Sequence, residues 1–535
     1  MRKLKVSKAI DFSFLQLALV FIILVLLKEL KILSPLFKYE LFAYVLLLPA
    51  IPALLARRPS EVRSLRGTLP ILMAAFLFAL SVRLFAQSHS SVPLGYDPGF
   101  YKYTMDLYAN ALPQIPEAGL ASWVKEINPQ GLFVLSDTMH VMAGTNALQF
   151  MNYLFPFLGA LLVFPIFVVT RALFGPRAGL VAAVLYAVSY TQFDVFTMFY
   201  FKNVLGLMFL LFSIYALERR RYGLMAIMVA ALGIFHRPEF LLFALILIPY
   251  FILHRRRGII FAVLGAAVLI APFWLPRWDA NWTVLTGTIE TAVSSIQNGE
   301  ELGGGTFFDF ATYRVVSLAY LPFALIGALF LVRKRNWNSV FFYFVISSII
   351  VVFQLFFFKR FIIPLDIVFV MLAAVGIDYI LLRREKISRV AGMAVILLLI
   401  VAAGIPTLDA AQDARPRITE DQLQSVEWIA ENTEEDAYVL ATSYDAPWAL
   451  GWSERRVIAP GLFEWNVHNR KEWHSFLRTG DLESAQLFLD AYEGPLYIYH
   501  SQNRGNYLNL AKFENMFFEK VYRKGAVVYR YLRGG

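Results

Sequence analysis

The carboxylate of Asp97 is the side chain of this sequence with the most evident capacity for chemistry. It lies in the segment GYDPGFYKYTMDLYA, residues 95–109, which begins just beyond an apolar stretch of membrane-spanning length. A carboxylate at the boundary between membrane and water can act as a general base on a hydroxyl or amide group, or it can bind a metal ion. Asp97 equally suits the N-cap of a helix that starts at Pro98, so the residues alone leave a structural role open.

Aromatic side chains surround Asp97 in the sequence. Membrane proteins place Tyr and Trp at the boundary between lipid and water, and the segment holds Tyr96, Tyr101 and Tyr103. We therefore expect a helix on the membrane surface directly after Asp97. Tyr101 and Lys102 of this helix are candidate contacts for an acceptor molecule or a glycan.

Basic side chains stand at the ends of several apolar stretches, on the face where membrane proteins carry fewer of them. Those that we single out are Lys202, His236, Arg237 and Arg360. A charge at such a boundary is costly unless it is solvated or paired, so a function is the default expectation. Arginine binds phosphate through two parallel hydrogen bonds and lysine contacts it as a point charge, so these residues are candidates for a donor phosphate.

Each basic residue also has a simpler interpretation. Lys202 is typical of a lysine whose stem lies along a helix end while its ammonium group reaches water. Arg237 can form a local pair with Glu239, and Arg360 can occupy an ordinary outer turn. The sequence leaves these alternatives open.

Membrane-spanning helices must position these residues, because apolar stretches of sufficient length recur from residue 12 to about residue 406. Hydrophobic residues make up 58% of the 535 residues and charged residues 16%, against about 25% charged in soluble domains. We predict about thirteen spans. They cover residues 12–27, 41–56, 67–86, 147–170, 178–193, 203–217, 222–235, 239–254, 259–275, 315–332, 339–357, 361–382 and 390–406.

The orientation of the spans follows from their loops, of which every second one is basic, as RRR at 219–221 and RKR at 333–335 are. Because cytoplasmic loops carry the excess of Lys and Arg, we place the N-terminus in the cytoplasm and the chain after residue 406 outside it, in a multi-pass protein of the cell membrane. The net charge of +10 is explained by these loops, so nucleic acid is not an expected partner. Cysteine is absent, which excludes disulfides and thiolate metal sites.

Three outer segments are long enough to carry function: a loop over 87–146, a loop over 276–313 and the polar tail from about residue 415. In the tail, helical stretches alternate with the strand-like runs AYVLAT, RRVIA, PLYIYH and AVVYRYL, which predicts a small α/β domain. The expected fold is thus an α-helical polytopic membrane protein with a C-terminal soluble α/β domain. Its divisions are two additional helices in 1–66, a membrane domain over 67–410 and an extracytoplasmic domain over 415–535.

The tail contains the segment SYDAPWALGWSERRVIAPG, residues 443–461. Its residues Tyr444, Asp445 and Trp448 are further candidate contacts for an acceptor or a glycan, because aromatic rings stack on sugars. Buried aromatic packing is the other use of such residues.

An Asp-Pro pair followed by aromatics and a basic residue, directly after an outward-running span, resembles the first outer loop of GT-C membrane glycosyltransferases. The resemblance is to archaeal oligosaccharyltransferase catalytic subunits and, more loosely, to protein O-mannosyltransferases. It implies that Asp97 is the catalytic or metal-binding carboxylate. FFFKRFIIPLD, residues 356–366, is similar to the family segment whose Arg binds the lipid-linked phosphate, which makes Arg360 the match. The family also has a basic residue that faces the donor site at a turn between two spans. The turn HRPE, residues 236–239, is similar, and His236 or Arg237 would match that residue.

Two segments depart from the oligosaccharyltransferase pattern. The second outer loop, TQFDVFTMFYFKN, has Asp194, Lys202 and Asn203 where the family carries a pair of metal-binding carboxylates. A divalent ion, Mg²⁺ or Mn²⁺, therefore has few ligands there. The segment at 443–461 lacks the tryptophan pair of the family's acceptor motif, so the resemblance does not indicate the acceptor.

The resemblance implies a GT-C-type glycosyltransferase. Such an enzyme would transfer a sugar or glycan from a polyprenyl-phosphate-linked donor to a protein or lipid acceptor outside the cytoplasm. The alternatives are a transporter or flippase of lipid-linked sugars and a non-catalytic glycan-binding membrane protein. A protein of either alternative kind would keep its function in the variant Asp97→Asn, whereas the enzyme would not.

Overall fold

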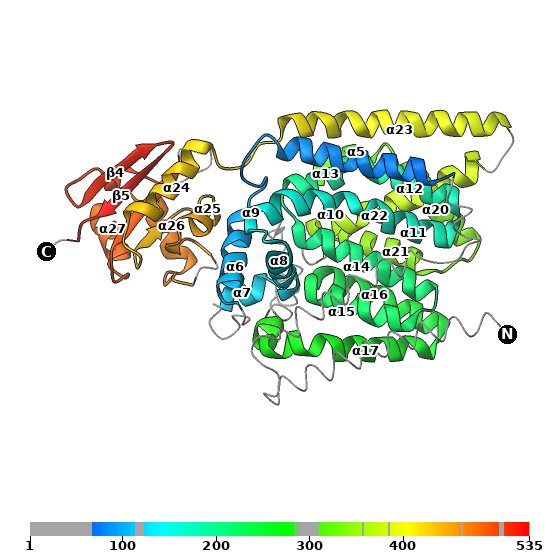
Figure 1. Cartoon of the computed structure of the whole chain (residues 1–535), viewed down its shortest axis with the longest axis horizontal. Coiled ribbons are helices and arrows are strands. Elements are labelled where there is room, and N and C mark those ends of the chain that lie inside the picture. Colours follow the sequence, from blue (N-terminus) through cyan, green and yellow to red (C-terminus); the bar gives the residue numbers. More distant parts are fainter. Residues whose placement is uncertain are drawn as a thin grey trace. The chain divides into compact units, whose positions relative to one another are not determined.

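The computed structural model describes residues 67–112, 122–283, 286, 310–355, 358–382, 386–461, 464–501 and 508–533. The chain divides into two compact units (Figure 1). The first comprises the residues up to His89, Asn128–Thr145 and Asn152–Ala414, and the second comprises Ser90–Ile127, Asn146–Met151 and Arg415–Gly535. The two predicted spans before residue 67 lie outside the described residues.

The first unit is built of apolar helices (Figure 1). They are α5 Leu69–Gln87, α8 Gln130–Ala143, α10 Phe155–Leu161, α11 Val163–Phe174, α12 Pro176–Ala187, α13 Tyr190–Thr197, α14 Phe201–Glu218, α15 Tyr222–Phe235, α16 Arg237–His254, α17 Arg257–Trp274, α19 Phe310–Ser317, α20 Leu321–Arg333, α21 Ser339–Val352, α22 Phe358–Ile377 and α23 Lys386–Asp413. Within the described residues, seven helical segments are long and apolar enough to cross a membrane, and an eighth is formed if α12 and α13, bent by 47°, make one span.

The observed helices fall where the hydropathy of the sequence placed the spans. Each predicted span from residue 67 onward overlaps with one of these segments or with one of the shorter apolar helices α15, α20 and α21. The chain is therefore a multi-pass membrane protein of mostly helical structure, and thirteen spans stays a prediction. The helices differ in how much of their apolar part is buried inside the protein. This share is 100% for α22, 83% for α14 and only 17% for α23. The helix α22, which packs against α12, α20 and α21, is thus central to the bundle.

The second unit contains a five-stranded sheet in the order β2-β1-β3-β5-β4. The strands are β1 Tyr438–Leu440, β2 Arg456–Ile458, β3 Leu496–Ser501, β4 Phe518–Lys524 and β5 Ala526–Tyr531. β1 pairs in parallel with β2 and β3, whereas β5 pairs antiparallel with β3 and β4. Strands β1, β2, β3 and β5 coincide with the four predicted runs. β4 was not predicted, because it is a largely exposed edge strand of sequence FEKVYRK without a long apolar run.

Helices of the second unit come from both ends of the chain's described part. They are α6 Pro98–Asn110, α7 Ser122–Ile127, α9 Ala147–Gln149, α24 Glu420–Asn432, α25 Ala446–Trp452, α26 Arg470–Arg478 and α27 Leu482–Leu489. Thr419 caps α24 through a reciprocal pair with Gln422. The core of the unit includes Trp473 and Phe476 of α26. The first outer loop, which the sequence assigned to the membrane domain, thus supplies α6 and α7 to the unit that holds the sheet.

Candidate functional site

The predicted phosphate-binding residues gather around His236 at one end of the helical bundle. Lys202 is the second residue of α14, Arg237 is the first of α16, and Arg360 lies in the first turn of α22. His236 lies in the turn between α15 and α16 and is 3% exposed. Burial, followed by the charges of Arg360, Lys202 and Arg237, lowers the pKa of the His236 imidazole well below its ordinary value. Residues far apart in the sequence therefore form one cationic cluster.

A carboxylate holds His236 inside this cluster. The Nδ1 atom of His236 contacts Oε2 of Glu239, which is 2% exposed. Asn203 donates from Nδ2 to Oε1 of the same carboxylate at 3.3 Å. Gly206 provides the room, since a Cβ there would lie 2.8 Å from Cβ of His236. Glu239 therefore pairs with the histidine and with Asn203.

Arg277 is a cation of this region that the sequence reasoning missed. It is 3% exposed and donates from its guanidinium to the backbone oxygen of Asn128 at 2.6 Å. The side-chain oxygen of Asn128 accepts a hydrogen bond from Nζ of Lys202 at 3.1 Å, so one residue holds both cations. Arg277 also lines a small cavity together with Arg237. The available signal was a basic residue at the start of an outer loop, which is the argument that identified Arg360.

Asp97 lies in the second unit, where α6 packs against α25. The contact is close because Gly99 has no side chain: a Cβ on it would lie 1.7 Å from the backbone oxygen of Pro447. Beside Asp97, the hydroxyl of Tyr96 donates to the backbone oxygen of Ser443, and its ring lies 6.0 Å from that of Tyr444. Burial, then the charges of Asp97 and Asp445, raise the pKa of Tyr96.

The predicted acceptor contacts therefore collect around the α6–α25 contact, but they differ in exposure. Tyr101 is 4% exposed, and Trp448 is 1% exposed with its ring 5.1 Å from that of Trp452. Asp445 is buried and accepts hydrogen bonds from the backbone nitrogen and the hydroxyl of Ser501, at 3.1 and 2.5 Å. The buried side chains of these residues thus serve the packing of the unit.

Lys102 and Tyr444 remain partly accessible. Lys102 pairs with Asp106 at 2.8 Å, and its ammonium lies 5.6 Å from the ring centroid of Trp452. The hydroxyl of Tyr444 donates to the backbone oxygen of Arg417 at 3.3 Å. Both side chains therefore lie at the surface of the unit close to Asp97 in sequence or in space, where they can contact a ligand.

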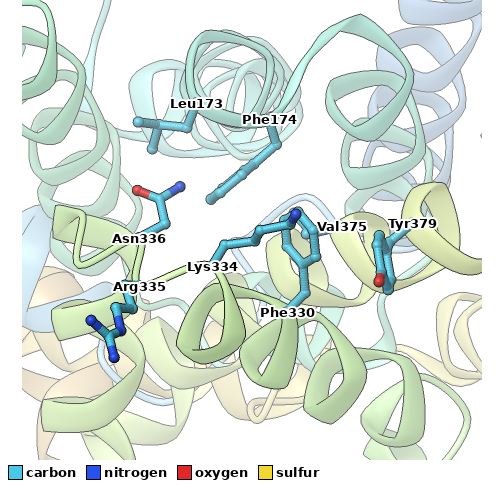
Figure 2. Close-up of a pocket in the computed structure, with 8 residues that line it drawn as sticks. All are labelled: Leu173, Phe174, Phe330, Lys334, Arg335, Asn336, Val375 and Tyr379. Carbon is cyan, nitrogen blue, oxygen red and sulfur yellow. The ribbon is translucent and has the colours of Figure 1, made fainter.

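A larger cavity lies at the opposite end of the bundle and is not part of this cluster. Figure 2 shows Lys334 reaching in among Phe174, Phe330 and Tyr379, while Arg335 points away. The rings of Phe330 and Tyr379 are 4.5 Å apart. The helix α22 carries Arg360 in its first turn and lines this cavity with Val375. Fifteen helical residues correspond to about 22 Å, so the two ends of α22 serve separate regions.

A metal ion finds no ready set of ligands in the described part of the chain. No group of three or more His, Asp or Glu side chains lies close enough together there to hold one. Asp194, the carboxylate of the second outer loop, accepts a hydrogen bond from the Thr197 hydroxyl at 3.1 Å. The metal suggested by the resemblance does not fit these residues, and no step below depends on it.

Known proteins give these observations a context. The family model described as dolichyl-phosphate-mannose-protein mannosyltransferase matches residues 138–276. The structure is similar to the oligosaccharyltransferase of Archaeoglobus fulgidus, with a TM-score of 0.59, 14% identity, and 81% of this chain and 69% of that chain covered. It is also similar to ArnT from Cupriavidus metallidurans bound to undecaprenyl phosphate, with a TM-score of 0.51, 13% identity, and coverage of 87% and 98%.

The chain has the GT-C fold. A third structure with this likeness is the mycobacterial arabinofuranosyltransferase AftD, with a TM-score of 0.54, 15% identity, and 86% of this chain and 40% of that chain covered. One structure of the Archaeoglobus fulgidus enzyme contains an inhibitory peptide and a dolichol-phosphate, and another contains Zn and sulfate. No curated protein matches the sequence. The predicted resemblance to GT-C glycosyltransferases is thus confirmed.

Proposed function

We propose that this chain is a membrane glycosyltransferase. It transfers a sugar or glycan from a polyprenyl-phosphate-linked donor to a protein or lipid acceptor outside the cytoplasm. The observation that carries the proposal is the cluster of Lys202, Arg237 and Arg360 around His236 at one end of a GT-C fold. Arg277 adds a further cation there. Basic side chains gathered in this way in a membrane protein are suited to the phosphate of a lipid carrier.

The cations act on the leaving group. As the bond between the anomeric carbon and the phosphate oxygen breaks, negative charge grows on that oxygen. Arg360 stabilises this charge with its planar fork, and Lys202 and Arg237 supply further positive charge. Lys202 is already oriented by Asn128, and His236 by Glu239, so the groups need little rearrangement when the phosphate arrives. The phosphate leaves on its lipid as the sugar is transferred.

Asp97 acts on the acceptor. Its carboxylate takes the proton of the attacking hydroxyl or amide group, or it anchors that group, while the acceptor atom forms the new bond to the anomeric carbon. Tyr444 and Lys102, which are partly accessible in the second unit, contact the acceptor or glycan. Tyr101, Asp445 and Trp448 are buried and hold α6 and α25, which lie next to these residues.

The comparisons support a lipid phosphate as the donor's carrier. ArnT binds undecaprenyl phosphate, and the Archaeoglobus fulgidus enzyme binds a dolichol-phosphate together with a peptide. On the orientation predicted from loop charge, the cluster faces away from the cytoplasm. A flippase of lipid-linked sugars would share the phosphate cluster but would not need Asp97.

The test is transfer of a labelled glycan from a native lipid extract to an endogenous acceptor, with purified wild type and Asp97→Asn. We expect transfer by the wild type and its loss in the variant, because the amide cannot accept a proton. Transfer that survives the substitution would keep the enzyme and reject Asp97 as its base. Absence of transfer by folded wild-type protein, with the carrier lipid still bound, would favour the flippase or the glycan-binding protein.

A further inference from the structure

The buried carboxylate of Asp366 lies at the break between α12 and α13, in the interior of the bundle. These two helices are bent by 47° across the residues Val188 and Ser189. Non-helical backbone inside a membrane protein requires other partners for its polar groups. The hydroxyl of Thr407 donates to the oxygen of Val188 at 2.9 Å, and Ser189 caps α13 by accepting from the backbone nitrogen of Gln192.

Asp366 accepts hydrogen bonds from residues of two other parts of the bundle. It is 0% exposed, and its carboxylate accepts from the Ser189 hydroxyl at 3.0 Å, from Nε2 of Gln192 at 2.9 Å and from the Tyr320 hydroxyl. Gln192 belongs to α13, and Tyr320 immediately precedes α20. A buried carboxylate with three donors is satisfied, and it fixes the elements that supply them.

A buried cation completes the arrangement. Arg83 of α5 is 2% exposed and donates to the backbone oxygen of Gln192 at 3.1 Å and to that of Ala79 at 3.0 Å. Gln192 is thus bonded to the positive group through its carbonyl and to Asp366 through its side-chain amide. Gln192 therefore links Arg83 of α5 with Asp366 of α22.

The network is attached to α22 where that helix is weakened. Pro364 lies inside α22 and has no backbone N–H to donate, which interrupts the helical hydrogen bonding at this point. Side chains reinforce this stretch: Nε2 of Gln192 donates to the oxygen of Ile363 at 3.2 Å, and the hydroxyl of Tyr343 donates to the oxygen of Pro364 at 2.7 Å. Arg360 lies six residues, or about 9 Å, before Asp366 on the same helix.

The other end of the network leads to Lys202. The helix α13 ends at Thr197, and a turn containing Phe199 at a φ of 62° joins it to α14, whose second residue is Lys202. We infer that Asp366 is a positioning residue. By bonding α22 to the start of α13, it sets the places of Arg360 and Lys202 relative to each other. The inference rests on the proposed function for what these two cations bind.

The experiment measures binding of undecaprenyl phosphate to the full-length protein in detergent, together with transfer from the labelled extract. Asp366→Asn is expected to weaken binding about 10- to 100-fold, because an amide group cannot accept from three donors. Tyr320→Phe removes one donor and is expected to weaken binding less. The matched control is Asp378→Asn, which removes another buried carboxylate about 18 Å further along the same stretch of helix and should bind as wild type does.

A double-mutant cycle with Arg360→Ala distinguishes an effect on the position of Arg360 from a general effect on the stability of the protein. If Asp366 acts through Arg360, adding Asp366→Asn to Arg360→Ala weakens binding little further. Full additivity, or wild-type binding by folded Asp366→Asn, would overturn the inference and leave the proposed function intact. If Asp366→Asn does not fold, Tyr320→Phe takes its place in the double-mutant cycle, and the same outcomes apply to it. Wild-type protein that neither binds the lipid nor transfers would overturn the proposed function and the inference with it.

Discussion

The two regions that carry the site residues are constructed differently. The cationic cluster lies on the ends of helices α14, α16 and α22, and the bulk of a membrane bundle fixes the places of its members. The surroundings of Asp97 depend instead on one short helix, α6, which packs against α25 through Gly99. The cluster is held by several helices of the bundle, of which α14 and α22 are largely buried, whereas Asp97 precedes one short helix of the other unit. The two regions can therefore be altered separately by substitution.

The largest expected effect comes from the cationic cluster. Arg360→Ala should lower transfer about 100- to 1000-fold, as the loss of a group that stabilises transition-state charge does elsewhere. The thermal unfolding of the variant should stay close to that of wild type. The control is Lys334→Ala, which removes a cation at the other end of the bundle. Equal transfer by Arg360→Ala and Lys334→Ala would show that a cation of the cluster contributes no more to transfer than a cation outside it.

A smaller effect is expected at the α6–α25 contact. Gly99→Ala places a methyl group against the backbone of Pro447 and should destabilise the second unit by about 1–3 kcal/mol. We expect transfer to fall while binding of undecaprenyl phosphate persists, which would separate the two regions functionally. Gly67→Ala is the control, since nothing lies within 4 Å of its added Cβ. Loss of lipid binding in Gly99→Ala but not in Gly67→Ala would contradict the view that the two regions act separately.

The smallest effect concerns a buried lysine that belongs to the fold of the second unit. Lys512 is 1% exposed and donates to the backbone oxygens of Phe476 and, at 3.2 Å, Thr479. Burial lowers its pKa from 10.5 to about 8. Between these values the unfolded chain holds a proton that the folded chain has lost, so stability rises with pH, by at most about 1.4 kcal/mol per pH unit.

Thermal unfolding of the full-length protein from pH 7.5 to 9.5 tests this slope. Lys512→Met should lose the part of the pH dependence that wild type shows above pH 8. Lys524→Met is the matched control, because Lys524 is exposed and pairs with Asp421 at 3.1 Å. An identical pH dependence in wild type and Lys512→Met would mean that Lys512 titrates alike in the folded and unfolded chain.

Particular residues show how far sequence reasoning reaches. The apolar stretches predicted α5 and the helices from α10 to α23, but not α8, which falls in the predicted outer loop over 87–146. Charge at the ends of the stretches predicted Lys202, His236, Arg237 and Arg360, which lie in one cluster. The same reasoning passed over Arg277, which lacks a neighbouring motif, and β4, whose residues are polar. It also assigned the loop after α5 to the membrane domain, whereas the structure groups α6 and α7 with the sheet.

The sequence by itself determined which segments enter the membrane and where charge stands at their ends. Hydropathy and charge are local properties of the sequence, and the preference of apolar segments for lipid and of charged segments for water applies to each segment separately. Only the tertiary structure decided that Gly99 faces Pro447 and that Arg83, Gln192 and Asp366 share one buried network. Such contacts join residues more than a hundred positions apart, and they depend on the packing of whole helices rather than on any local pattern.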